Sequence, residues 1–138
     1  MFVFWKKKRE QRKEIDQGFH YARLWRENEP LQRCFNALRG SFTVAQAYHQ
    51  EAVEATVAIA LTEDNWAEAV DIPGDFLPEK CFLYWNDSTL PMLLCESAEV
   101  LSHLHEVTAL STETFLIAET MDRIVQLKDE SVLLYSIA

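Results

Sequence analysis

The spacing of apolar residues changes once along this chain, close to Lys80, and the change restricts the folds open to it. Before this point apolar side chains recur at three- and four-residue steps, which is typical of helices packed by one face. After it, aromatic and β-branched residues run in short stretches, of which Cys81–Trp85 is the strongest,. This order predicts an α+β fold, in which N-terminal helices are followed by an antiparallel sheet of about four or five strands with one inserted helix.

Two helices are expected in the first forty residues. The first runs from about Lys6 to Asn28 and carries an apolar stripe on an otherwise charged rod,. The second covers about residues 31–38, with Asn28 or Glu29 as its N-terminal cap and Pro30 in its first turn,. Gly40 lies just beyond its end, which is a common way for a helix to stop,.

A third helix is expected to begin at Thr43, which forms a capping box with Gln46,. Its helical spacing continues to Ile59, although the stretch 55–61 is compatible with a strand as well. Residues 62–65 then form a turn or another helix start, and Pro73, Gly74 and Pro78 mark a loop,.

The strand-rich half is predicted from alternation and from turn residues. We expect a strand at Cys81–Trp85, a turn at residues 86–88, a short extended run at residues 91–94, a helix of about ten residues capped by Ser97, a strand within Thr108–Ala118, and a hairpin of residues 123–127 and 132–137 around the loop Lys128–Ser131,.

The composition suits one domain over residues 1–138. With 49% hydrophobic and 12% aromatic residues the chain can build a core,. No stretch approaches the roughly 18 apolar residues that cross a bilayer. The aromatic start Met1–Trp5 precedes the basic run Lys6–Arg9, the reverse of the order in a secretory signal,. We therefore expect a cytoplasmic protein without a membrane partner.

Charge is divided along the chain. The net charge is −9, but residues 1–40 carry ten Lys/Arg against five acids, whereas residues 41–138 carry three against seventeen. The two parts thus hold +5 and −14. An acidic surface repels the phosphates of nucleic acid and speeds association with a basic protein. The same charges have plainer interpretations, in which the acidity serves only solubility and the basic N-terminal part is a solvated helix face.

Several kinds of catalytic site are excluded or disfavoured. The three glycines, at positions 18, 40 and 74, are too far apart for a phosphate-binding loop or a dinucleotide fingerprint,. The cysteines, at positions 34, 81 and 95, form no CxxC pair and fit buried free thiols better than a metal centre,. Glu99 and His103, one helical turn apart, are the best metal-like pair, but a surface ion pair is commoner at this spacing,. We expect no enzyme activity, cofactor or metal.

Aromatic residues flanked by acids are the better candidates for a functional surface, because Trp and Tyr dominate binding interfaces and acids answer Lys or Arg. Trp66 fits both a binding and a core role, whereas Trp85, inside a predicted strand, fits the core better. The residues we expect to bind a partner are Glu63, Asp64, Trp66, Glu68, Asp71, Asp75 and Asp87.

Residues 80–137 resemble small bacterial immunity proteins, which protect a cell against toxins of contact-dependent inhibition or polymorphic toxin systems. The resemblance is carried by the aromatic strand and turn 82–87, the run Leu90–Leu93, the helix ending near 105–109, the strand Thr114–Ile117 and the terminal hairpin from Arg123. It implies a non-enzymatic inhibitor that binds a basic, nuclease-type toxin domain and blocks its active site or substrate groove, with carboxylates standing in for phosphates.

Two alternatives stay open. The same acidic surface would serve an adaptor or regulatory subunit with a different protein partner. A small enzyme or ligand-binding domain would instead need a pocket that holds carboxylates beside His49 or His103. A homodimer is compatible with any of these functions.

Overall fold

The computed structural model describes residues 28–137. The predicted helix from Lys6 lies outside the described residues. Within them, seven strands form one sheet in the order β1-β4-β3-β5-β6-β7-β2, and every neighbouring pair is antiparallel. The α+β class is confirmed. The strand number is larger than expected, and the predicted order of helices before strands is wrong, because β1 precedes α3 and two helices follow β4.

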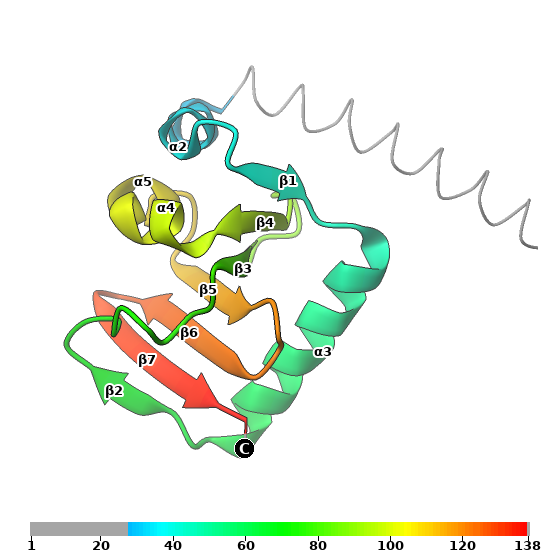
Figure 1. Ribbon diagram of the computed structural model, residues 1–138, viewed down its shortest axis with the longest axis vertical. Helices are drawn as coiled ribbons and strands as arrows, with labels where there is room; N and C mark the ends of the chain where they lie inside the picture. Colours follow the sequence, from blue (N-terminus) through cyan, green and yellow to red (C-terminus); the bar gives the residue numbers. More distant parts are fainter. Residues whose placement is uncertain (1–27, 138) are drawn as a thin grey trace, which may run out of the picture.

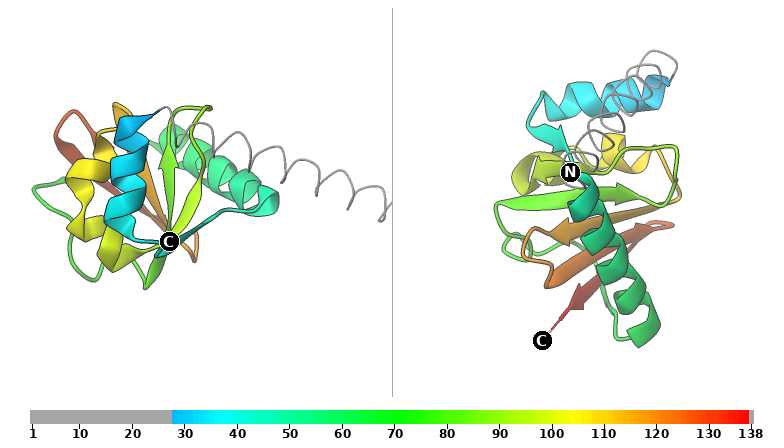
Figure 2. Two further views of the ribbon diagram at one scale, coloured as in Figure 1. Left: turned by 90° about the horizontal axis from the view of Figure 1, so that it is seen from above. Right: turned by 90° about the vertical axis from the view of Figure 1, so that its right-hand side faces the viewer.

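Three layers are visible when the molecule is seen from above (Figure 2, left). The sheet lies in the middle, α3 covers one face, and α2, α4 and α5 cover the other (Figure 1). The α3 face buries Val53, Val57, Phe82 and Ile117. The opposite face buries a larger set that includes Cys34, Cys81, Trp85, Cys95 and Val107.

Helix α2 (Glu29–Leu38) follows the local rules that predicted it. The Asn28 side chain accepts a hydrogen bond from the Leu31 amide at 3.1 Å, which caps the helix, and Pro30 lies in the first turn,. The helix ends at Arg39, in the left-handed region with φ 52°, and Gly40 follows with φ 76°,.

Helix α3 (Ala47–Glu63) begins four residues later than predicted. The proposed capping box is wrong, because Thr43 lies in strand β1 (Phe42–Val44) and is paired with Leu94 of β4 (Leu93–Glu96). The stretch 55–61 is helical rather than extended. Its ambiguity has a physical reason: α3 is apolar on its buried side but also exposes Tyr48, Ile59 and Leu61, so no amphipathic period stands out,.

Strand β3 (Lys80–Trp85) occupies the predicted position and pairs with both β4 and β5 (Glu113–Ala118). β4 is shifted two residues beyond the expected run at 91–94. The helix expected at Ser97 is interrupted: α4 (Ser97–Ser102) and α5 (Leu104–Thr108) are separated by His103, whose φ of −130° is not helical. Ser97 is a buried first residue of α4 and makes no cap.

The C-terminal hairpin lies where it was predicted, but its turn has two residues rather than the four expected at Lys128–Ser131. Strands β6 (Arg123–Lys128) and β7 (Ser131–Ser136) are joined by Asp129 and Glu130, both with positive φ, as the tightest hairpin turns require,. The other side of β7 pairs with the edge strand β2 (Ala67–Ala69), which had not been predicted. The loop from 70 to 79 then crosses the α2, α4 and α5 face, where Leu77 joins the core.

Candidate functional site

The chain from the last residue of α3 to just beyond β2 carries four exposed acids. Asp64 ends α3 in the left-handed region, with φ 51°, and turns the chain into the edge strand. The carboxylates of Glu63, Asp64, Glu68 and Asp71 are all on exposed residues. These four predicted site residues are thus exposed at neighbouring positions, and their role in binding stays a prediction.

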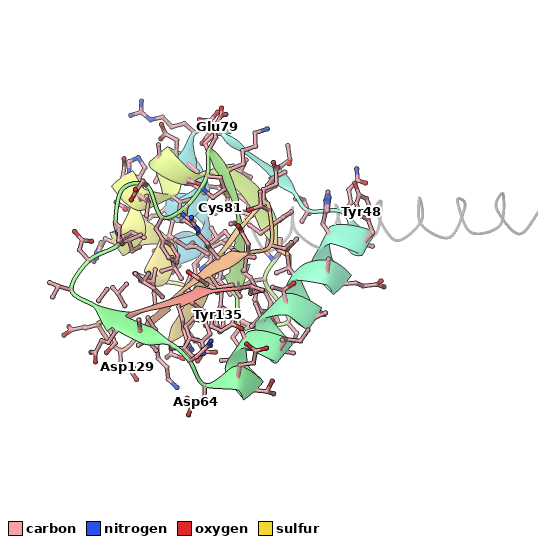
Figure 3. All side chains as sticks on the ribbon, turned by 60° about the horizontal axis from the view of Figure 1, so that its bottom comes forward. Tyr48, Asp64, Glu79, Cys81, Asp129 and Tyr135 are labelled. Carbon is pink, nitrogen blue, oxygen red and sulfur yellow. The ribbon has the colours of Figure 1, made fainter. Side chains whose placement is uncertain are left out.

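Two more acids join them through the β2–β7 pairing. Ala69 pairs with Val132, so the β6–β7 turn, with its exposed Asp129 and Glu130, lies near the C-terminal end of β2. In Figure 3, Asp64 and Asp129 lie toward opposite ends of this strand. We name the six side chains together the acidic edge: Glu63, Asp64, Glu68, Asp71, Asp129 and Glu130.

An aromatic contact fixes the start of the acidic edge. Trp66 is half-buried, and its ring lies 5.2 Å from the ring of Tyr135, centroid to centroid. Its indole nitrogen donates to the Ala60 carbonyl at 3.2 Å, which holds it against the last turns of α3. Trp66 therefore packs against the core on one side and is partly accessible on the other, and its role in binding stays a prediction.

Tyr135, which contacts Trp66, also forms a hydrogen bond with the carboxylate of Glu63. Its ring is buried in the core beneath α3, and its hydroxyl donates a hydrogen bond to Glu63. This hydrogen bond, with smaller contributions from burial and from the negative charge of Glu63, raises the pKa of Tyr135,. Tyr135 was not among the predicted site residues, because only the β2–β7 register brings it to Trp66.

Two predicted site residues do not belong to this surface. Asp87 lies beyond β3, four strands from β2, or roughly 19 Å at about 4.8 Å per strand,. Its carboxylate accepts from the amide and the hydroxyl of Thr89, at 2.9 and 2.6 Å, and these bonds lower its pKa. Asp75 is exposed, but its loop packs on the face of the sheet opposite α3, where the Asp75 carbonyl accepts from Arg123 at 3.3 Å.

A groove adjoins the acidic edge at the β6–β7 turn. It has a volume of about 420 Å³ and lies between α5 and the hairpin. Leu104, Leu127 and Val132 supply its apolar lining, and Asp129 and Glu130 lie at its rim.

The metal-like pair of the sequence is a surface contact. The His103 and Glu99 side chains are 3.8 Å apart, at the i, i+4 spacing of a helix. Among residues 28–137, no three His, Cys, Asp or Glu side chains are grouped so that they could hold a metal ion. The same part of the chain has no helix that is both long and apolar enough to span a bilayer.

Trp85 is a core residue, as expected. It is 1% exposed, and its indole nitrogen donates to the Val107 carbonyl at 2.7 Å, which fixes α5 against the sheet. All three cysteines are free and buried, also as expected.

The chain has no match among protein-family models. No curated protein is significantly similar to it.

Proposed function

We propose that this chain is a bacterial immunity protein that binds and neutralises a basic, nuclease-type toxin domain without doing chemistry itself. The acidic edge is the observation that carries the proposal. It lines one edge of the sheet with six exposed carboxylates, and a half-buried tryptophan lies at its start. Residues 28–137 as a whole hold eighteen acids against five Lys/Arg. Such a surface suits a partner whose own groove is built to hold phosphates.

The chemistry of inhibition follows from charge and geometry. A nuclease active site gathers Lys and Arg around the position of the nucleic-acid backbone. Carboxylates on the inhibitor occupy the same cationic groups, and Trp66 supplies an aromatic anchor of the kind that dominates interface energies,. The acidic edge then excludes the nucleic acid by occupancy and by like-charge repulsion.

The test is a binding and inhibition experiment with the toxin domain encoded beside this gene. The two purified proteins would be mixed at micromolar concentration and examined by size-exclusion chromatography and by a nuclease assay. A stable complex that suppresses cleavage in proportion to its occupancy is the expected result. No complex at micromolar concentration would sink the proposal, and a stable complex with an unrelated cellular protein instead would favour an adaptor.

A further inference from the structure

The groove beside the acidic edge combines an apolar lining with hydroxyl and carboxylate side chains. Leu104 of α5, Leu127 of β6 and Val132 of β7 supply the apolar part, and all three are only partly buried. Asp129 and Glu130 lie at the turn end, where both are exposed. The remaining lining includes four hydroxyl side chains, those of Thr108, Ser111, Thr112 and Ser131.

Lys128 is the one cation among the described residues that line the groove, and it pairs with Glu113. Lys128 alternates with Leu127 along β6, so the two side chains lie on opposite faces of the sheet,. Its ammonium group is 3.6 Å from the carboxylate of Glu113. The carboxylates of Asp129 and Glu130 have no ion pair with a described residue, so the rim keeps its negative charge.

This combination fits a long cationic side chain better than it fits a small apolar ligand or a phosphate. The aliphatic stem of arginine packs on apolar surface while its charged head reaches polar groups. A guanidinium has five donors in a rigid fork, which suits two carboxylates and several hydroxyls better than the three donors of an ammonium group do. Phosphates would be repelled by Asp129 and Glu130.

We propose that the groove between α5 and the β6–β7 hairpin is the binding site for an arginine side chain of the partner. This inference rests on the proposed function, since it names the group of a basic partner that is held most tightly. The partner's arginine lies with its stem along Leu104, Leu127 and Val132, and its guanidinium meets Asp129 and Glu130. The rest of the acidic edge steers the partner toward this contact.

The first test uses hexa-arginine as the probe, with the full chain labelled with nitrogen-15. Titration should shift the amide resonances of residues 127–132 and of α5 more than those around Glu63 and Asp64. The double substitution Asp129→Asn with Glu130→Gln removes the charge and keeps side-chain size, and it should weaken hexa-arginine binding about tenfold. The matched control is Glu51→Gln with Glu54→Gln, which removes equal charge from exposed residues of α3 outside the acidic edge and should weaken binding by less than about threefold,.

Two outcomes would overturn the assignment. Equal weakening by the two double substitutions would show that only the overall charge matters. Equal binding of hexa-lysine and hexa-arginine would show that the fork of donors is not recognised. In the toxin complex, the Asp129/Glu130 substitutions should raise the dissociation rate about tenfold. If a complex forms and its dissociation rate is unchanged, the groove assignment fails while the proposed function stands.

Discussion

The phenol of Tyr135, at the end of β7, donates its hydrogen to the carboxylate of Glu63, the last residue of α3. This bond joins the helix on one face of the sheet to a strand that is its neighbour only in space. It also holds the Glu63 carboxylate, part of the acidic edge, against the buried ring of Tyr135.

The Tyr135–Glu63 bond predicts a pH dependence on the alkaline side. It favours the neutral phenol and raises the pKa of Tyr135 above its ordinary value of 10.0,. The stabilisation is therefore fully present below pH 10.0 and is lost as the pH rises through the raised value. The difference in unfolding free energy between the parent and Tyr135→Phe should be constant from pH 6 to 9 and should shrink above pH 10. A difference that grows with pH would contradict the assignment.

Asp87 should matter for stability and not for binding. Its hydrogen bonds with Thr89 lower its pKa below 3.8, so its contribution is present above that pH and is lost as the pH falls through the lowered value,. The variant Asp87→Ala should be less stable than the parent at pH 7, and the two should converge in acid. Urea unfolding at several pH values measures this. Loss of partner affinity without loss of stability would restore Asp87 to the binding surface.

Trp85 should be more costly to replace than Trp66. Trp85→Phe removes the donor to the buried Val107 carbonyl and should lower the unfolding free energy by about 1–3 kcal/mol in urea titrations,. Trp66 is only half-buried, so Trp66→Phe is the matched control and should cost less. Equal losses would mean that burial does not make the Trp85 hydrogen bond more stabilising than the Trp66 bond to Ala60.

The thiols should be unreactive in the folded protein. Burial raises the pKa of Cys34 to about 12 and that of Cys81 to about 11, and it raises the pKa of Cys95 as well. Because the thiolate is the reactive form, a disulfide reagent at pH 8 should modify the thiols only as fast as the protein unfolds. All three should react at once in guanidinium. Rapid modification of a single thiol under native conditions would show that its site opens locally.

The acidic edge predicts a kinetic effect on partner binding. The charge reversals Glu68→Lys and Asp71→Lys should slow association with a basic partner at low salt, with a smaller effect as salt rises. Both residues are exposed, so stability should change by less than about 0.5 kcal/mol,. Glu119→Lys, at the β5–β6 turn, is the control with the same change of charge. An equal effect at Glu119 would mean that net charge alone sets the rate.

Local sequence predicted those elements whose stabilising groups are near neighbours. The cap of α2 at Asn28 and the position of the C-terminal hairpin are of this kind. Strands β1 and β2 escaped prediction because each has three residues and is defined by partners far along the chain, Cys95 for Phe42 and Leu134 for Ala67. Thr43 has the chemistry of a helix cap, but its pairing with β4 prevails.

In the candidate site, too, the sequence predicted what is local along the chain and not what depends on strand pairing. The acids from Glu63 to Asp71 lie within nine residues of the chain, so the sequence alone groups them. Asp129 and Glu130 belong to the acidic edge only because of the β2–β7 register. Asp87 lies apart from the acidic edge, and its neighbour Thr89 was informative. An aspartate followed two residues later by threonine readily satisfies its own carboxylate in a turn, as Asp87 does here,.

The two edges of the sheet are formed by the strands on either side of α3 in the sequence (Figure 1). β2 therefore leaves the ribosome long before its partner, since Ala67 and Leu134 are 67 positions apart. At about 5–20 residues per second, roughly 3–13 s of synthesis separate the two. During that interval the nascent chain holds Trp66 without Tyr135, and the surface that we propose for binding takes shape only once β7 has been translated.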